Sequence, residues 1–399
     1  MCTYIKSSKI YCEEGIKSGF LRLEDGRFAG IYEKISQTED YMDYDEYSII
    51  PGIFDTHNHG IMGYSIKHSE ANDNTEEIRG YVKALLAYGV TMVFPTVMDG
   101  VGFKEIAQVA AEKTRGAAIA GIHSEGPYLN RVGENGKSKS YPEVSLKLVE
   151  DMIEKSEGRL RLFALAPEIP GTDKILPYLM KQNITVAIAH SNCNAMMTRE
   201  AIDNGITVAT HLGNVMTGIH HRDIGILGAC LLDDRVDCEL ICDGIHICND
   251  MLELILKVKD KKRIMMISDG TPFGGLNAHS CIYNLGGTLI KVESGGRVLD
   301  EDGKINGSSK TVMDGMKNLV KNLRMPLGSV WPMASLNPCI KYGFSDKKGS
   351  IASGKDADFV VIDDEFNVIS TFMAGKMVFS KEQKQQLINL NFVKLSRLD

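Results

Sequence analysis

The segment Pro51-Gly52-Ile53-Phe54-Asp55-Thr56-His57-Asn58-His59 carries the pattern that decides the fold. It completes an apolar run, Ser48–Phe54, of the kind expected for a strand that is buried on both faces. The run then changes at once into polar residues, with two histidines two positions apart. A buried strand that ends in chemically capable side chains is typical of parallel α/β folds, whose sites gather at the carboxyl ends of the strands.

Seven more apolar runs follow the first, and helix-like segments such as Glu76–Ala87 and Phe103–Lys113 connect them. Gly89 and Gly205 precede two of the runs at positions typical of helix C-caps. The alternation predicts an α/β fold, a (β/α)₈ TIM-type barrel, with a doubly wound open sheet as the competing arrangement. The eight predicted strands are Ser48–Phe54, Val90–Pro95, Ala118–Ile122, Leu160–Leu165, Ile184–Ala189, Ile206–Ala209, Cys238–Ile241 and Arg263–Ile267.

Polar residues follow the predicted strands, and they are of types that bind metals or transfer protons. Seven of the ten histidines lie at or just beyond strand ends. In a barrel all of these side chains would converge on one mouth, which favours the barrel over the open sheet. The residues are His57, His59, His123, Glu125, Glu168, His190, His211, His221, Asp243, His246 and Asp269.

Six of these residues, from five strand ends, form a ligand set for Zn²⁺ or a similar divalent ion. One metal would take Glu125, His190 and His211; a second would take His57, His59 and Asp269, with Glu125 shared. Bound metal lowers the pKa of a coordinated water to about 7. Asp269 would then accept the proton of the water and deliver it to a leaving amine. Each residue alone has a structural explanation, such as a helix N-cap, but the six together predict a hydrolytic metal centre.

Composition bounds the remaining possibilities. The chain has 399 residues, a net charge of −7 and 43% hydrophobic residues, so it is a globular protein without a general attraction to nucleic acid. Nine cysteines, an odd number without a CxxC pair, argue against a disulfide framework. The N-terminus lacks the apolar run of a signal peptide, and no segment reaches the ~18 apolar residues of a membrane span. We therefore expect a cytoplasmic protein with neither nucleic-acid nor membrane partners.

Both ends of the chain contain alternating runs with turns, for example Gly19–Leu23 and Asp358–Ile362. They predict a small β-sandwich domain made of residues 1–50 and 346–399, beside a barrel of residues 51–345. Strand-like runs in Gly286–Lys304 predict either an excursion from the barrel or part of the cover of the site.

At this point the chain resembles the N-acetylglucosamine-6-phosphate deacetylases of the amidohydrolase superfamily, over nearly its whole length. The Glu-Gly-Pro turn at Glu125 is the specific signal, because most relatives in the superfamily use a carboxylated lysine as the bridging group. The resemblance rests on Pro51–Gly60, Gly121–Asn130, Ala189–Ser191, Thr210–Met216, His221-Arg222, Asp243–His246, Ser268-Asp269, Gly307-Ser308, Asn337-Pro338 and Gly349–Asp358.

The resemblance implies roles for matching positions. Glu125, His190 and His211 would hold the principal metal, and Asp269 would be the catalytic acid and base. Some members lack the first histidine pair and use one metal, whereas this chain keeps His57 and His59, so one or two ions are expected. Zinc is the expected ion, with iron, manganese or cobalt as alternatives.

Substrate contacts are also implied by the resemblance. Asn214, the backbone of Val215 and Arg222 would bind the phosphate, for which a guanidinium is well suited, and His246 would bind a sugar hydroxyl. The substrate is then a phosphorylated amino sugar, and the habit of the family is a homodimer. The chain departs from the family in segments 133–140, 213–215 and 270–275, all of them around the substrate rather than the metal.

The predicted reaction is hydrolysis of N-acetylglucosamine 6-phosphate to glucosamine 6-phosphate and acetate. An N-acetylgalactosamine-6-phosphate deacetylase is an alternative that differs only at the sugar 4-hydroxyl. Another metal-dependent amide hydrolase of the superfamily is a further alternative. A barrel without catalysis is a third, but such a protein would be expected to lose ligands.

Overall fold

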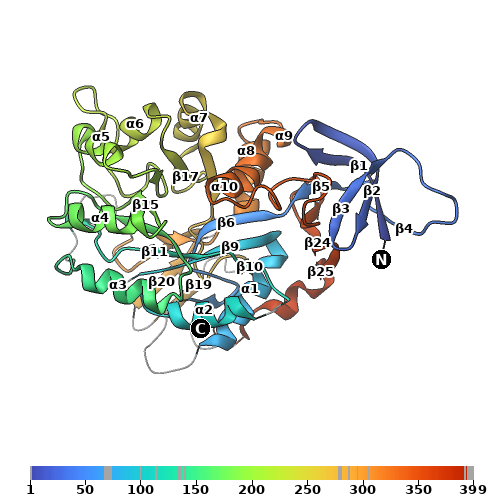
Figure 1. Cartoon of the computed structure of the whole chain (residues 1–399), viewed down its shortest axis with the longest axis horizontal. Coiled ribbons are helices and arrows are strands. Elements are labelled where there is room, and N and C mark those ends of the chain that lie inside the picture. Colours follow the sequence, from blue (N-terminus) through green and yellow to red (C-terminus); the bar gives the residue numbers. More distant parts are fainter. Residues whose placement is uncertain are drawn as a thin grey trace.

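The structure is a computed structural model, and it describes residues 2–66, 74–98, 100–112, 115–132, 137–138, 141–276, 281–285, 288–293, 295–303, 305–390 and 392. Its largest element is a parallel sheet that curves into a barrel surrounded by helices (Figure 1). The order around the barrel is β6-β9-β11-β14-β15-β16-β17-β18, and the short β10 is added to β9. The predicted (β/α)₈ barrel is confirmed. The barrel strands are β6 (Ile53–Asn58), β9 (Val90–Val97), β10 (Ala118–Ile119), β11 (Ile122–Glu125), β14 (Leu160–Leu165), β15 (Thr185–Ile188), β16 (Val208–Ala209), β17 (Asp237–Ile241) and β18 (Ile264–Ile267).

Helices cover the outside of the barrel (Figure 1). Their apolar faces pack on the strands, as in α1, whose Ile78, Val82 and Leu85 are buried. Gly89 ends the helical segment before β9 in a left-handed conformation with φ of 74°, as its predicted C-cap role requires. The helices are α1 (Thr75–Leu85), α2 (Phe103–Ala111), α3 (Leu146–Lys155), α4 (Thr172–Lys181), α5 (Ala195–Asp203), α6 (Gly225–Leu232), α7 (Asn249–Val258), α8 (Val312–Lys321), α9 (Leu327–Ala334) and α10 (Leu336–Lys341), with 3₁₀ turns η1 (Leu86–Tyr88), η2 (Lys261–Arg263) and η3 (Lys381–Leu387).

The first predicted strand, Ser48–Phe54, is wrong as one element. It divides at Gly52 into β5 (Ser48–Pro51), which belongs to the small domain, and β6, which begins the barrel. Gly52 lies so close to Thr91 that an added Cβ would stand 2.2 Å from the Thr91 hydroxyl oxygen. The third predicted strand also divides, into β10 and β11, and β11 continues through Glu125. The predicted site residues His57, His123 and Glu125 therefore lie within the last residues of β6 and β11 rather than beyond the strands.

The barrel closes between its first and last strands at the mouth. There the Asp269 amide donates to the His57 carbonyl (3.0 Å) and the His59 amide donates to the Gly270 carbonyl (2.8 Å). Asn58 and Gly270 form a parallel bridge at the same place. Closure therefore runs through the backbone of the predicted ligands themselves.

Apolar side chains fill the inside of the barrel below this mouth. Phe54 and Phe94 meet edge to face with ring centroids 5.0 Å apart, and Leu162, Val208 and Met265 are buried in the same cluster. The interior is thus a packed core, as is usual for eight-stranded parallel barrels. This core supports the residues at the mouth from below.

The two chain ends form a small β domain beside the barrel, as predicted (Figure 1). Its sheet curves so that strands from both ends share one core, which includes Ile5, Leu21, Phe359 and Phe372. The bounds 1–50 and 346–399 stay our prediction for this domain. The strands run in the order β25-β24-β23-β5-β1-β2-β3, with β4 on β1: β1 (Cys2–Cys12), β2 (Gly15–Glu24), β3 (Arg27–Tyr32), β4 (Tyr41–Asp43), β23 (Phe359–Ile362), β24 (Val368–Met373) and β25 (Lys376–Ser380).

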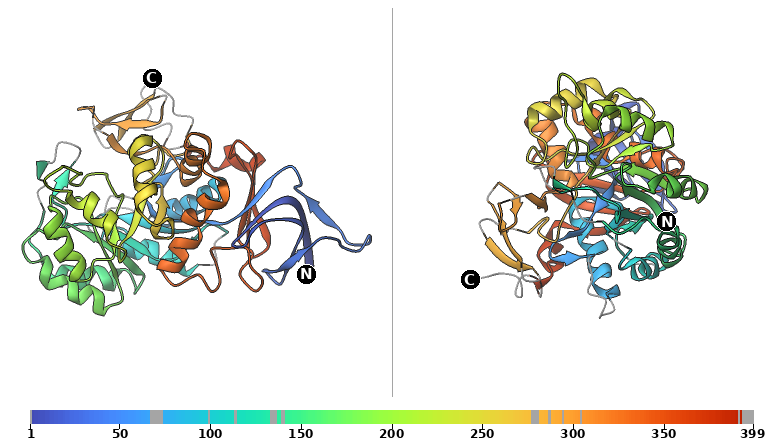
Figure 2. Two further views of the ribbon diagram at one scale, coloured as in Figure 1. Left: turned by 90° about the horizontal axis from the view of Figure 1, so that it is seen from above. Right: turned by 90° about the vertical axis from the view of Figure 1, so that its left-hand side faces the viewer.

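A separate sheet follows β18, where strands were expected in Gly286–Lys304. Figure 2 shows it in orange, apart from the small domain. Two short pairs complete the described strands, and no helix in the described part of the chain is both long and apolar enough to cross a membrane. These strands are β19 (Cys281–Leu285), β20 (Thr288–Val292), β21 (Arg297–Leu299) and β22 (Ile305–Ser308) in the separate sheet, and the pairs β7 (Gly60–Ile61) with β8 (Tyr64–Ser65) and β12 (Arg131–Val132) with β13 (Lys137–Ser138).

Candidate metal centre

Three of the predicted ligands meet where β11, β15 and β16 end. Nε2 of His190 and Nε2 of His211 lie 3.0 and 3.1 Å from Oε1 of Glu125, and 3.1 Å from each other. Nδ1 of His190 is 3.0 Å from the Arg131 carbonyl oxygen, which can only accept, so Nδ1 carries the proton and Nε2 is left with a lone pair. The predicted group Glu125, His190 and His211 is therefore assembled as one cluster.

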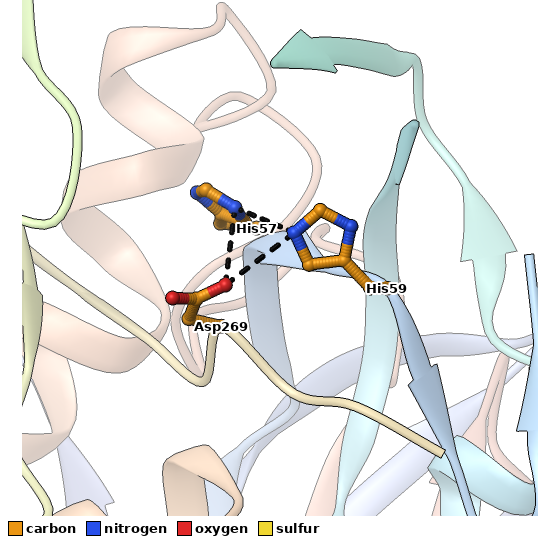
Figure 3. A group of neighbouring side chains, drawn as sticks. All are labelled: His57, His59 and Asp269. Carbon is orange, nitrogen blue, oxygen red and sulfur yellow. Dashed lines mark hydrogen bonds and ion pairs between the residues drawn. The ribbon is translucent and has the colours of Figure 1, made fainter. Parts of the chain in front are cut away.

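The other three predicted ligands meet where β6 and β18 come together. Figure 3 shows the side chains of His57, His59 and Asp269 pointing toward one another. Nε2 of His57 and Nε2 of His59 are 3.1 Å apart and lie 3.3 and 3.4 Å from Oδ1 of Asp269. The expectation that the two histidines of the HxH pair face the same side is confirmed.

The carboxylate of Glu125 lies between the two groups. Its Oε1 faces His190 and His211, while its Oε2 lies 3.3 Å from Nε2 of His59 and 3.7 Å from Nε2 of His57. Glu125 thus approaches both groups, in the position expected of a shared bridging ligand.

The donor set fits divalent cations. Nε2 of His190 and Oε1 of Glu125 lie at hydrogen-bond distance, yet each presents a lone pair to the other. These lone pairs repel each other unless positive charge lies between them. Six nitrogen and oxygen donors in two groups match the ligands that Zn²⁺ and similar ions take. The residues present therefore fit two ions.

The electrostatics of the cluster support this conclusion. Burial disfavours ionised Glu125, but the neighbouring His57 holds the pKa of its carboxyl well below the usual value. Burial likewise opposes ionised Asp269, yet His57 and His59 lower its pKa. Burial opposes a charged His59 imidazole as well, but Asp269 and Glu125 raise its pKa to about 9. The site thus keeps both carboxylates ionised and attracts positive charge.

Three of the six ligands occupy a strained backbone conformation. The φ angles of His190, His211 and Asp269 are 44°, 33° and 48°, in the left-handed region that residues with a side chain rarely adopt. Val215, a β-branched residue just beyond His211, has φ of 50°. Such strain costs on the order of 1–3 kcal/mol per residue and concentrates at functional sites. It turns each side chain sharply out of its strand and toward the mouth.

A buried network below the ligands was not expected from the sequence. Asp55 accepts hydrogen bonds from the Ser268 hydroxyl (2.6 Å) and the Asn58 amide (3.1 Å), and burial raises the pKa of its carboxyl to about 6. These bonds join β6 to the segment after β18, next to His57 and Asp269. The only sequence signal was the aspartate two positions before the first histidine.

His123 was grouped with the polar strand ends, but it lies below the metal-binding residues. Its ring is fully buried and packs edge to face on His57, with centroids 4.6 Å apart. Glu168 also has a structural role, because it accepts from the Ser191 hydroxyl (2.7 Å) and the Asn130 amide (2.9 Å). Glu168 therefore orders the segments around His190.

The predicted substrate residues differ in how they are held. The backbone N–H of Asn214 donates to the His211 carbonyl (2.8 Å). Arg222 is exposed in the loop before α6, beside the exposed His221, and its guanidinium makes no hydrogen bond or ion pair with the described residues. Nδ1 of His246 donates to Asp243 (2.8 Å), while its Nε2 is buried without a partner among the described residues. Most of the 133–140 segment lies outside the described residues.

Known proteins share sequence and fold with this chain. The amidohydrolase family profile matches residues 48–378, so the chain belongs to the amidohydrolase family. An N-acetylglucosamine-6-phosphate deacetylase of Vibrio furnissii is 30% identical over 338 residues, which is 83% of each chain. The chain belongs, within the amidohydrolases, to the family of these deacetylases, as its motifs indicated.

One further relative and one solved structure are also similar to this chain. An N-acetylgalactosamine-6-phosphate deacetylase of Escherichia coli O157:H7 is 30% identical over 384 residues, covering 94% of this chain and 99% of that one. The crystal structure of the Pasteurella multocida N-acetylglucosamine-6-phosphate deacetylase has the same fold, with a TM-score of 0.84 at 24% identity, covering 94% of this chain and 99% of that one.

Proposed function

We propose that this protein hydrolyses N-acetyl-D-glucosamine 6-phosphate to D-glucosamine 6-phosphate and acetate. The observation that carries the proposal is the position of Glu125 between two histidine pairs, in a chain of the deacetylase family. The curated relatives from Vibrio furnissii and Bacillus subtilis bear this activity in their names. The reaction belongs to the breakdown of amino sugars.

The six clustered residues would hold the metal. Glu125, His190 and His211 would bind one ion, and His57, His59 and Asp269 would bind a second, with Glu125 between them. Zinc is the expected ion, and iron, manganese and cobalt are the alternatives. A bound divalent ion polarises the acetyl carbonyl and makes water a stronger acid and nucleophile.

Asp269 would be the catalytic acid and base. Its carboxylate is ionised at neutral pH, because His57 and His59 oppose the effect of burial on its pKa. It accepts one proton as water oxygen attacks the acetyl carbon, and it returns that proton to the sugar nitrogen as the C–N bond breaks. The products are the free amine and acetic acid, whose remaining proton passes to solvent or to the amine to leave acetate, and Asp269 is again ionised.

The residues around the mouth would select the substrate. Arg222 would bind the phosphate as a bidentate guanidinium, together with Asn214 and the backbone of Val215. The unpartnered Nε2 of His246 would meet a sugar hydroxyl. These assignments are supported because neither the guanidinium of Arg222 nor Nε2 of His246 has a hydrogen-bond partner among the described residues.

Release of acetate tests the proposal directly. Purified protein, loaded in turn with Zn²⁺, Fe²⁺, Mn²⁺ or Co²⁺, should release acetate and primary amine in equal amounts from N-acetylglucosamine 6-phosphate. Unphosphorylated N-acetylglucosamine is the control and should react far more slowly. No acetate with any of the four ions would overturn the proposal.

N-Acetylgalactosamine 6-phosphate is a second candidate substrate, because the Escherichia coli relative named for that activity is as similar as the Vibrio furnissii one. The two sugars differ only at the 4-hydroxyl. Comparison of kcat/KM for the two epimers decides between them, and we expect the gluco epimer to be preferred. We also expect a homodimer in the cytoplasm, and light scattering on the purified protein would test the assembly.

A further inference from the structure

A fully buried carboxylate lies inside the barrel directly below the metal-binding residues. Glu239 is in the middle of β17, and its side chain has no exposed surface. An ionised carboxylate in such a place is costly unless it is paired or hydrogen-bonded. The mechanism above gives it no role, so its partners indicate what it does.

Glu239 has one satisfied oxygen and one without a partner. Its Oε1 accepts a hydrogen bond from the Thr56 hydroxyl (2.5 Å). Among the described residues its Oε2 has no hydrogen-bond partner, and it lies 3.9 Å from Nδ1 of His57, a buried ring nitrogen that also has none there. The register of β6 is irregular between Asp55 and Asn58, and consecutive residues Thr56 and His57 both approach this carboxylate. The two unpartnered atoms therefore face each other.

We infer that Glu239 is a positioning residue that accepts the Nδ1 proton of His57 and thereby holds its Nε2 lone pair toward the second metal. A carboxylate can only accept, so a proton on Nδ1 satisfies both buried atoms at once. A movement of about 1 Å brings the atoms to ordinary hydrogen-bond distance. The arrangement fixes the ring tautomer and makes Nε2 more electron-rich, as outer carboxylates do for metal-binding histidines.

The two metal-binding groups then differ in how they are supported. His190 gives its Nδ1 proton to a neutral backbone carbonyl, that of Arg131, whereas His57 would give its proton to a charged carboxylate. Hydrogen bonds to ionised acceptors are roughly twice as strong as neutral ones. Glu239 would therefore strengthen metal binding by the group of His57, His59 and Asp269, and not by the group of His190 and His211. The inference rests on the second metal of the proposed function.

Glu239→Gln is the sharpest test. The amide has nearly the same shape but no charge. Turned one way it presents an N–H to His57, which favours the proton on Nε2; turned the other way it offers a neutral oxygen, a weaker acceptor for the Nδ1 proton than a carboxylate. We expect the affinity for the second ion to fall by roughly 10–100-fold while the first ion is held as before. Stoichiometry and affinity are measured by elemental analysis and by titration of metal-free protein with Zn²⁺.

Asp237→Asn is the matched control. It makes the same change of carboxylate to amide on the same strand, at a residue held by Arg263 (3.2 Å) and Lys341 (2.8 Å). It should lower the melting temperature yet leave both ions bound. Equal affinity of Glu239→Gln and the unchanged protein for both ions would overturn the inference, as would an equal loss of the second ion in Asp237→Asn.

Glu239→Asp carries the test if the glutamine variant does not fold. It keeps the charge but withdraws the carboxylate from His57, so second-ion affinity should again fall alone, and unchanged affinity overturns the inference. A wild-type protein that binds one ion, unaffected by His59→Ala, would overturn the second site and the inference together. Two ions without acetate release would remove the proposed reaction but leave the role of Glu239 to be decided by the metal titration.

Discussion

His211 and Arg222 both follow β16, eleven residues apart, but they are opposite in character. His211 is 1% exposed, is held in a strained backbone and contacts Glu125 and His190. Arg222, on the same loop, is exposed, and its guanidinium has no partner among the described residues. The ligands are held by strand ends, packing and hydrogen bonds. The side chain of Arg222, the predicted phosphate residue, has no hydrogen bond or ion pair with a described residue.

The difference indicates a division of labour. Ligands that must stay within a fraction of an ångström are placed at the ends of packed strands. Residues that select among sugars are placed on loops, where substitution costs little stability. The chemistry of the site should therefore be sensitive to small changes, while substrate preference should change without harm to the fold.

Removal of metal is expected to have the largest effect. A strong chelator should abolish acetate release, since the proposed reaction depends on a metal-activated water, and added Zn²⁺ or Mn²⁺ should restore it. The melting temperature should fall as well, because an ion that binds the folded state stabilises it. Full activity in chelated, metal-free protein would contradict the assignment.

Asp269→Asn should come next. It removes the proton acceptor while keeping a similar shape, so kcat should fall by roughly 10²–10⁴-fold, the range of general acid–base catalysis. KM for the phosphorylated sugar should change little, and metal analysis should still find the ion held by Glu125, His190 and His211. An unchanged kcat would remove Asp269 from the mechanism.

Arg222→Ala tests the other side of the comparison. KM for the phosphorylated sugar should rise by roughly 10–100-fold, because a charge-assisted hydrogen-bond pair is worth about 1.5–3 kcal/mol. Unphosphorylated sugar should show no such change. Arg235→Ala is the control, since Arg235 is an exposed arginine paired with Asp203 (2.9 Å) away from this loop. An equal effect on both sugars would refute the phosphate role.

Ser268→Ala should have the smallest effect, on stability rather than selectivity. The variant removes a buried donor to Asp55 and lowers the free energy of unfolding by about 1–3 kcal/mol. Ser8→Ala, at an exposed serine bonded to the Asp45 carbonyl, should change it by less than about 0.5 kcal/mol. Denaturant unfolding compares the two, and equal losses would show that the Asp55 network does not support the mouth.

Sequence patterns predicted the barrel, and they also predicted that the six candidate ligands lie together. Both predictions need only the positions of the strands along the chain. Apolar runs mark strands, and the residue after each run must lie at the mouth. The division of Ser48–Phe54 was missed, although the Pro51-Gly52 pair inside the run is a signal for a break. That Gly52 must pass against Thr91 depends on tertiary structure. The strained backbone of His190, His211 and Asp269 likewise depends on tertiary structure.

Glu239 escaped for a different reason. One glutamate in the apolar run Cys238–Ile241 is a visible signal, because a charged residue inside a buried strand requires a partner. The partner, however, lies on the first strand, and only the closed barrel brings Thr56 and His57 to it. The substrate loops remain the least predictable part, since few contacts determine them.

Closure of the barrel through its own active site also has a consequence for synthesis. Asp55 and Ser268, which join the first and last strands beside the ligands, are 213 residues apart. At the usual speed of translation, roughly 10–40 s separate the emergence of His57 from that of Asp269. During that interval the nascent chain carries a histidine pair without its carboxylate. The proposed second metal site is therefore complete only in a chain whose last barrel strand has been made and has folded against the first.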